Sequence, residues 1–133
     1  MNEFEFEDGV WMEGVPELDK DGNESIVWYR VPITEVPLTV LLQEYEDLVL
    51  ELGKKEVELG KVKEEYTTKE FEIVFKSDID FKKLYGSTQE KVRKQHAKEV
   101  LSDLSKKKAD LQLSVDFIRE YIPLLKEVIR SKQ

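Results

Sequence analysis

The first residues of the chain alternate apolar with acidic positions. Phe4 and Phe6 are interleaved with Glu3, Glu5 and Glu7. Because successive side chains of a strand point to opposite faces, this period of two predicts a half-buried strand. One face of that strand is aromatic and the other is acidic.

A β hairpin is predicted just after this strand. Residues 25–31 are rich in β-branched and aromatic side chains, which favour strands. Residues 19–23, Asp-Lys-Asp-Gly-Asn, are typical of a turn because these residue types tolerate left-handed backbone. We expect a small hairpin between residues 10–12 and residues 26–31, within a β or irregular element that covers residues 1–36.

The chain then changes to a helical period. Pro37 suits the first turn of a helix, where its missing N–H costs nothing. A heptad stripe through residues 37–80 has apolar residues at eight of twelve positions, and it weakens after Tyr66. We therefore expect a first helix over residues 37–80.

A break between helices is predicted at residues 81–87. Gly86 suits the end of a helix. Residues 87–90, Ser-Thr-Gln-Glu, match a capping box, in which each end of the motif satisfies an orphan N–H near the other. The sequence thus predicts a short connection followed by a new helix.

The second helix is expected over residues 88–131. Nine of eleven stripe positions from residue 94 to residue 129 are apolar. Pro123 interrupts this stripe, and a proline inside a helix removes one hydrogen bond at a cost of about 3 kcal/mol. We expect a kink near residues 119–123, or a break with a short final helix.

These elements predict a mainly α protein with a single domain over residues 1–133. Two helices joined by a short connection favour a long antiparallel two-helix hairpin, similar to a coiled coil, with the small N-terminal β hairpin at its open end. The helices carry more apolar surface than one contact between them can cover. The β hairpin, with Trp11, Trp28 and Tyr29, is the natural cover, and a second copy of the chain is the alternative.

Two lysines interrupt the apolar stripes, Lys55 in the first helix and Lys108 in the second. A lysine is tolerated at such a position because its stem packs while its ammonium group reaches water. In the antiparallel register, we expect Glu56 or Glu58 to pair with Lys108.

Charge is distributed unevenly along the chain. The net charge of −8 arises in the first 25 residues, which hold nine acids and one base. The remaining residues are balanced, but residues 82–108 carry nine bases and three acids. An acidic start and a basic middle therefore need separate explanations.

Several classes of chemistry are disfavoured by composition. The chain has no Cys and one His, His96, so thiolate nucleophiles and the commonest metal-ligand sets are missing. We expect no metal or other cofactor and no enzymatic activity. No apolar run approaches the roughly 20 residues of a membrane span, so we expect a cytoplasmic protein that has no membrane partner.

The acidic start is the first candidate binding site. It offers carboxylates to a basic groove on a protein partner, as a nucleic-acid mimic does, and the alternative is an edge strand that charge protects from aggregation. The acids proposed to contact a partner are Glu3, Glu5, Glu7, Asp8 and Glu13.

The basic segment is the second candidate. Its cations suit phosphate contacts and its aromatics suit base stacking, and the alternative is a solvated helix face. The residues proposed to contact nucleic acid are Tyr85, Lys91, Arg93, Lys94 and Lys98.

Residues 81–94, Phe-Lys-Lys-Leu-Tyr-Gly-Ser-Thr-Gln-Glu-Lys-Val-Arg-Lys, precede a leucine-heptad helix. This run resembles small helical early-region proteins of unknown function from tailed phages and prophages of Gram-positive bacteria, and the resemblance covers residues 38–130. It implies a setting in the cytoplasm of an infected or lysogenic host. The resemblance also implies a role like that of many early phage proteins, which act on host or phage nucleic-acid machinery, including nucleases and defence systems.

Three functions remain open at this point. The first is a non-enzymatic phage-type interaction protein that binds and inhibits, or adapts, a host or phage protein that processes nucleic acid. The second is a nucleic-acid-binding accessory factor in replication or recombination that uses the basic hairpin tip. The third is a structural coiled-coil component, for which a homodimer is expected.

Overall fold

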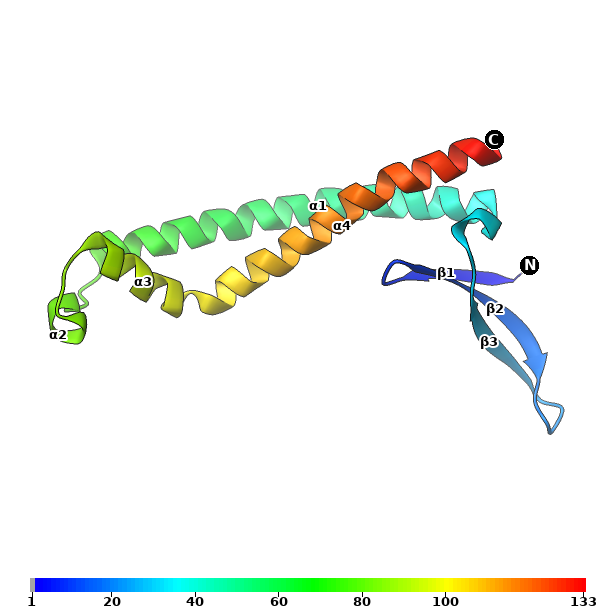
Figure 1. The fold of residues 1–133 in the computed structure, drawn as a ribbon, viewed down its shortest axis with the longest axis horizontal. Coiled ribbons are helices and arrows are strands. Elements are labelled where there is room, and N and C mark those ends of the chain that lie inside the picture. The colour runs from blue at the N-terminus through cyan, green and yellow to red at the C-terminus, as the bar shows by residue number, and fades with distance from the viewer. Residues whose placement is uncertain (1) are drawn as a thin grey trace. The chain divides into compact units, whose positions relative to one another are not determined.

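In the computed structural model, which describes residues 2–133, a three-stranded antiparallel sheet precedes a series of helices (Figure 1). The mainly α class with a small N-terminal β element is confirmed. The chain divides into two compact units, and helices α1 and α4 contribute to both. Unit 1 comprises the chain up to Leu50 together with Glu120–Gln133, and unit 2 comprises Glu51–Arg119.

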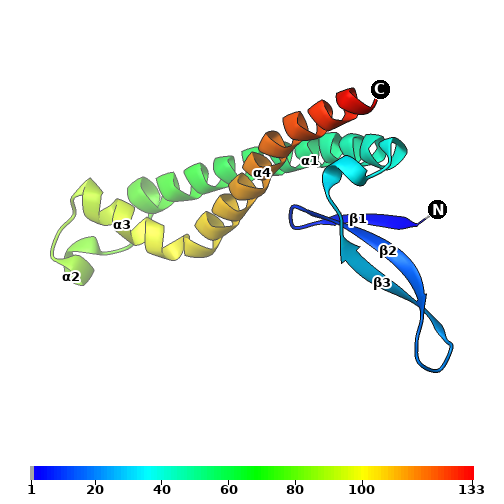
Figure 2. The ribbon, with the colours of Figure 1, turned by 45° about the vertical axis from the view of Figure 1, so that its right-hand side comes forward.

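The sheet of unit 1 has the order β1-β2-β3 (Figure 2). It consists of β1 (Glu3–Glu7), β2 (Val10–Leu18) and β3 (Glu24–Arg30). The predicted pairing of residues 10–12 with residues 26–31 is confirmed at Met12, which lies opposite Arg30, and the pairing continues beyond the predicted segment to Leu18 opposite Glu24. The first strand is not separate from this hairpin, however. It pairs with β2, so the N-terminal element is a sheet of three strands.

The β1–β2 connection explains this difference. Asp8 and Gly9 form a two-residue turn with φ of 51° and 81°. Two successive left-handed residues make a type I′ turn, whose twist matches that of paired strands. An Asp-Gly pair between alternating apolar residues is a strong hairpin signal, and it identifies β1 as a paired strand. In the predicted turn, the Asp19 carboxylate accepts hydrogen bonds from the N–H groups of Asp21 and Asn23 at 2.9 and 2.8 Å.

The core of unit 1 is formed where the sheet meets parts of the two long helices, α1 (Leu38–Phe71) and α4 (Ser102–Lys132). Trp11 from β2 is buried, as are Leu41 from α1 and Leu125 from α4. The other two residues predicted to cover the helices, Trp28 and Tyr29, lie in β3, and Tyr29 is exposed. The sheet therefore covers part of the apolar helix surface through Trp11.

The first helix is shorter than the sequence predicts. α1 ends at Phe71 and passes into a π-helical turn, η2 (Glu72–Lys76), after which residues 77–80 are not helical. The hydroxyl of Ser77 donates to the Ile73 carbonyl at 2.6 Å, which satisfies one of the last carbonyls of the turn. This end falls where the apolar stripe weakens.

The predicted connection contains a further short helix, α2 (Phe81–Tyr85). The Asp80 carboxylate accepts from the Lys83 N–H at 3.0 Å and so caps its first turn. Gly86 ends the helix with φ of 71°, and its N–H donates to the Lys82 carbonyl at 2.8 Å. The prediction of a helix end at Gly86 is confirmed.

The second predicted helix is divided into α3 (Glu90–Val100) and α4. The two meet at Leu101, which is buried and leaves helical geometry for one residue. The predicted capping box is wrong, because Gln89 is the N-cap and its side chain makes no capping bond. Ser87 lies too far upstream for that role and instead accepts the Gln89 N–H at 3.2 Å.

Helix α4 runs through Pro123 without the break that was one of the two expectations. Proline removes one backbone donor, but it leaves the other hydrogen bonds of the helix in place. The buried residues Ile118 and Leu125, on either side of the proline, keep both parts of α4 packed on apolar neighbours. Packing thus outweighs the local cost of the proline.

Within unit 2, polar side chains link α1 to α4. The Lys55 ammonium group donates to the Ser114 hydroxyl at 2.7 Å and lies 3.1 Å from the Glu51 carboxylate. The Arg119 guanidinium donates to the Glu56 carboxylate at 2.8 Å. The stripe lysine of α1 is therefore half-buried with its charge satisfied.

The expected pairing of Lys108 with Glu56 or Glu58 is wrong. Lys108 places its ammonium group 4.4 Å from the centroid of the Tyr66 ring, a cation–π contact. Its neighbour Lys107 lies 3.7 Å from Glu58, and Glu56 binds the arginine of α4. Tyr66, an aromatic residue of the first apolar stripe, thus offers Lys108 a contact that the spacing of residues in the sequence does not reveal.

Candidate protein-binding site

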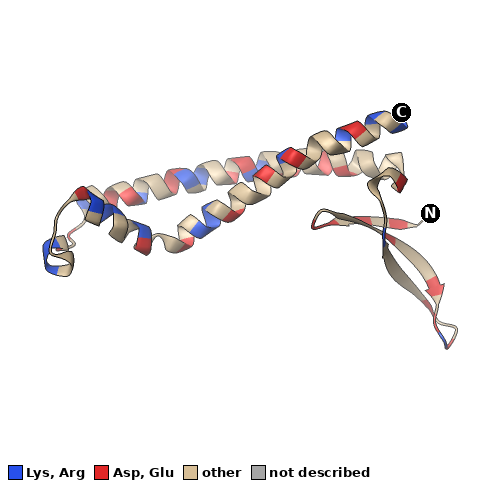
Figure 3. Cartoon of the chain, viewed as in Figure 1, with Lys and Arg blue, Asp and Glu red and all other residues tan. Residues whose placement is uncertain are grey.

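The acidic and aromatic residues of β1 lie on opposite faces of the strand. Glu3, Glu5 and Glu7 are exposed, whereas Phe4 and Phe6 are half-buried. Figure 3 shows acidic residues along β1. Three of the five predicted partner-binding acids therefore form one continuous row.

β1 is held in place by its aromatic face. The ring of Phe6 stacks on Tyr121 of α4 with 4.5 Å between centroids and lies 5.2 Å from the Trp11 ring. The indole N–H of Trp11 donates to the Tyr121 hydroxyl at 2.6 Å. Burial raises the pKa of Tyr121, and the nearby Glu44 raises it further, while the bond from Trp11 opposes that rise.

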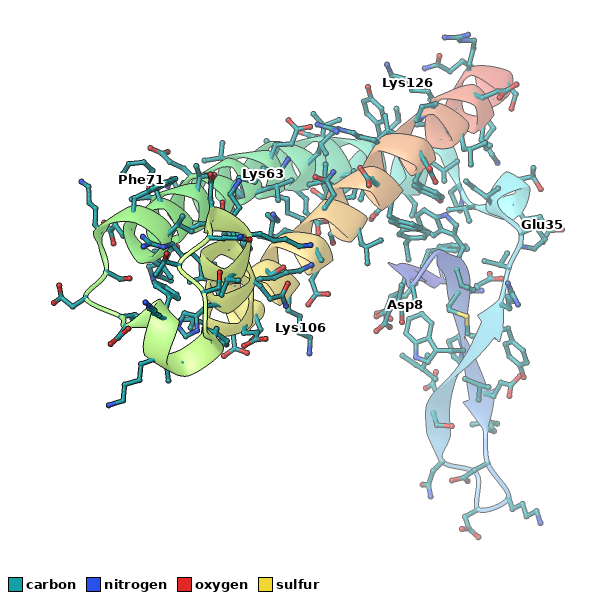
Figure 4. All side chains as sticks on the ribbon, turned by 60° about the vertical axis from the view of Figure 1, so that its left-hand side comes forward. Asp8, Glu35, Lys63, Phe71, Lys106 and Lys126 are labelled. Atoms are coloured by element: carbon teal, nitrogen blue, oxygen red, sulfur yellow. The ribbon has the colours of Figure 1, made fainter. Side chains whose placement is uncertain are left out.

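The other two predicted acids lie apart from this row. Asp8 is in the β1–β2 turn (Figure 4). Glu13 lies opposite Phe4 in the pairing of β1 with β2, so its side chain is on the aromatic side of the sheet. There it accepts a hydrogen bond from the Asn2 amide at 2.9 Å.

A groove of about 530 Å³ lies between β1 and the start of α1. From β1 it is lined by Glu5, Glu7 and the two phenylalanines, and from α1 it is lined by further acids, Glu44 and Asp47. No Lys or Arg is among the described residues that line it. The acids of α1 were not predicted as site residues. Their spacing of three places them on one helix face, but only the fold brings that face to β1.

The aromatic part of the second candidate site is a packed cluster. The Tyr85 hydroxyl is 2.6 Å from Nδ1 of His96, and both rings pack against buried Phe81. The Arg93 guanidinium lies 5.2 Å from the Phe81 ring centroid and donates to the Val74 carbonyl at 3.0 Å. Tyr85 and Arg93 thus hold α2, η2 and α3 together.

The lysines of the second site gather elsewhere. Lys91, Lys94 and Lys98 follow one face of α3 and line a shallow groove of about 470 Å³ together with Tyr66. Glu70 and Glu90 line the same groove, and Glu90 lies 3.2 Å from Lys94. The structure therefore separates these three lysines from the tyrosine and arginine that were predicted with them.

Within residues 2–133, no three His, Asp or Glu side chains are grouped so that they could hold a metal ion. No helix in that described part of the chain is both long and apolar enough to cross a membrane. Comparison with protein-family models, with curated proteins and with solved structures finds no match for this chain.

Proposed function

We propose that this chain is a non-enzymatic interaction protein that binds a basic surface of a protein partner through its N-terminal sheet. The acidic row of Glu3, Glu5 and Glu7 makes the contact. The partner is a host or phage protein that processes nucleic acid, and the chain inhibits or adapts it in a phage setting. A surface that normally holds phosphates is basic, so a row of carboxylates can occupy it.

The single observation that carries this proposal is the groove between β1 and α1. Acidic residues of two separate elements line it, Glu5 and Glu7 of β1 on one side and Glu44 and Asp47 of α1 on the other. An edge strand that needs only protection from aggregation requires charge on the strand itself. Acids on the facing helix are not explained by edge protection, and they favour a basic partner.

We further propose that α1 and α4 form an antiparallel two-helix hairpin as the framework for this site. Contacts inside unit 2 support it. Lys55 donates to the Ser114 hydroxyl, and Lys108 lies 4.4 Å from the Tyr66 ring centroid. Residue numbers thus fall along α4 as they rise along α1. Leu124, which is 58% exposed, leaves apolar surface for the homodimer that we propose as a secondary partner.

The test is quantitative capture from a Gram-positive bacterial lysate followed by mass spectrometry. The triple variant Glu3→Gln, Glu5→Gln and Glu7→Gln keeps both phenylalanines, so β1 keeps its anchors while losing three charges. We expect capture of the specific partner to fall about tenfold or more, and inhibition of its purified activity to fall with it.

A matched variant controls for net charge. Glu64→Gln, Glu99→Gln and Glu120→Gln remove three charges from exposed helix positions outside the groove. Capture by this control should equal that of the unmodified protein. Equal capture by both triple variants would contradict the proposal that the acidic row contacts the partner.

A second candidate function is nucleic-acid binding by α3. The observation that favours it is the shared groove of Lys91, Lys94 and Lys98 beside an aromatic ring, which combines phosphate-binding cations with a stacking surface. The acids in the same groove reduce its positive charge. This function therefore stands second to the binding of a protein partner.

Fluorescence anisotropy with a single-stranded oligonucleotide at two salt concentrations tests this candidate. Phosphate contacts predict binding that weakens steeply with salt and with Lys94→Glu. Lys63→Glu on α1 is the matched control and should leave binding unchanged. No binding at low salt would eliminate the candidate.

A further inference from the structure

The outer edge of β1 has backbone groups without a strand beside them. β1 is an edge strand in the order β1-β2-β3. Glu7 and Val10 flank the two-residue turn, so they form a hydrogen-bonded pair, and such pairs alternate along an antiparallel ladder. The N–H and C=O groups of Phe4 and Phe6 therefore point away from β2. Among the described residues, no backbone bond outside the sheet reaches them.

The outer edge of β1 borders the acidic groove, and the other wall of that groove does not pair with it. The groove is lined by the whole segment from Phe4 to Glu7, and its other wall is formed by α1 residues from Thr39 to Asp47. An α-helix satisfies its own backbone groups, so α1 offers the edge side chains but no ladder of hydrogen bonds. The edge and the groove together leave room for a strand supplied by another chain.

The two faces of β1 define what that strand must look like. Neighbouring side chains on adjacent strands lie on the same face of a sheet. An added strand would place every second side chain beside Glu5 and Glu7, and the others beside Phe4 and Phe6. Basic residues fit the first set of positions and apolar residues fit the second.

We propose that β1 accepts a fourth, extended strand from the partner, in which basic and apolar residues alternate. This inference rests on the proposed function and specifies its binding mode. Backbone hydrogen bonds to Phe4 and Phe6 supply the pairing, and the acids of both groove walls select for Lys or Arg. The same acids repel acidic strands and further copies of β1, so the edge is open only to a basic segment.

The first experiment uses a short capped peptide in which Lys alternates with Val and Thr. Two isomers of it carry N-methyl groups at alternate backbone nitrogens, one on each edge of the extended peptide. Strand addition uses only one edge, so we expect one isomer to lose binding about tenfold or more and the other to retain it. Equal affinities of all three peptides would overturn strand addition.

A second experiment changes the protein in place of the peptide, with a matched pair of variants at Phe4. Phe4→Pro removes the outward N–H at a position where an edge strand tolerates proline, and Phe4→Leu removes the ring but keeps the N–H. We expect the proline variant to bind the peptide about tenfold more weakly than the leucine variant, because both lack the ring and only the leucine variant keeps the N–H. Circular dichroism and thermal unfolding verify that both variants are folded.

Amide hydrogen exchange measures the proposed backbone hydrogen bonds of β1 directly. Adding the peptide should slow exchange at Phe4 and Phe6 about tenfold, while Glu5, whose N–H already pairs with β2, changes little. Unchanged exchange at Phe4 and Phe6 at saturating peptide would overturn the inference, as would a lack of peptide binding at low salt.

Failure of this inference can be distinguished from failure of the proposed function. If the captured partner depends on Glu3, Glu5 and Glu7 but not on the Phe4 N–H, then charge makes the contact and strand addition is wrong. If capture is insensitive to the three acids, the proposed function fails whatever the peptide does.

Discussion

Tyr121 is the residue on which the N-terminal strands depend. Its hydroxyl accepts a hydrogen bond from the indole N–H of Trp11, and its ring stacks on Phe6. Residues from two strands thus contact one side chain of α4. Trp11 is 4% exposed, and a buried indole N–H without a partner is costly. The position of the proposed binding strand thus follows from a contact between the two ends of the sequence.

Tyr121→Phe should lower the free energy of unfolding by about 1–3 kcal/mol, because it leaves the Trp11 N–H unsatisfied while keeping the stacked ring. Tyr29→Phe is the matched control. Its hydroxyl donates to Glu17 at 2.6 Å in an exposed position, so its loss should change stability little. Urea unfolding followed by circular dichroism measures both, and equal effects would contradict the role given to Tyr121.

The same residue predicts a loss of stability in alkali. Burial raises the pKa of Tyr121 in the folded chain above its ordinary value of 10.0. The unfolded chain therefore releases this proton first, and its contribution to stability, complete below about pH 10, is lost as the pH rises through the folded value. Between pH 9 and pH 12, the free energy of unfolding should therefore decline less steeply for Tyr121→Phe than for the unmodified chain.

At the scale of elements, the sequence predicts the period of each segment better than its ends. The alternation around Phe4 and the heptad stripe around Leu41 both follow from burial of one face, and both elements are present. The boundary at Phe71 and the interruption at Leu101 depend on packing within unit 2. The weakening of the apolar stripe after Tyr66 indicates the region of the first boundary but not its residue, and no local motif marks the interruption at Leu101.

The candidate site shows the same limit. Its strand acids are readable from the alternation in β1, because a half-buried strand must expose them. The helix acids Glu44 and Asp47 enter the site only because Phe6, Trp11 and Tyr121 dock the sheet beside α1. The surplus apolar surface of the helices predicts a cover that includes Trp11, but nothing in the spacing of residues along the chain predicts that this cover places β1 beside Glu44 and Asp47.

Two glycines in different elements give opposite predictions for the same change. A Cβ at Gly14 of β2 would lie 3.0 Å from side-chain atoms of Ile26 and Trp28, so Gly14→Ala should cost about 1 kcal/mol. Gly53 of α1 has nothing within 4 Å of that position. Gly53→Ala should therefore stabilise the helix by about 0.5–1 kcal/mol. Thermal unfolding compares the two, and a stabilising Gly14→Ala would contradict the tight packing of β2 on β3.

At the scale of the whole molecule, the two units differ in charge. Unit 1 contains fifteen acids and five bases, whereas unit 2 contains fourteen acids and sixteen bases. The acidic excess of the whole chain thus belongs to the unit that holds the sheet. The proposed basic partner would therefore be attracted to unit 1, and unit 2 would contribute little to long-range steering.

Salt should therefore stabilise the protein at neutral pH. Repulsion among the acids of unit 1 is screened as the Debye length falls to about 10 Å at 0.1 M salt. We expect Tm to rise between about 10 and 200 mM NaCl, and to rise less for the variant with Glu3, Glu5 and Glu7 changed to Gln. A Tm that is independent of salt in both proteins would contradict this account.

The discontinuity of unit 1 also has a consequence for biosynthesis. Trp11 and Tyr121 are separated by 110 residues, and both are needed for the same core. At a synthesis rate of roughly 5–20 residues per second, the first strands leave the ribosome roughly 5–20 s before α4 can cover them. During that interval the nascent chain exposes Phe6 and Trp11, and a chaperone that recognises such aromatic segments has time to bind before the protein can fold.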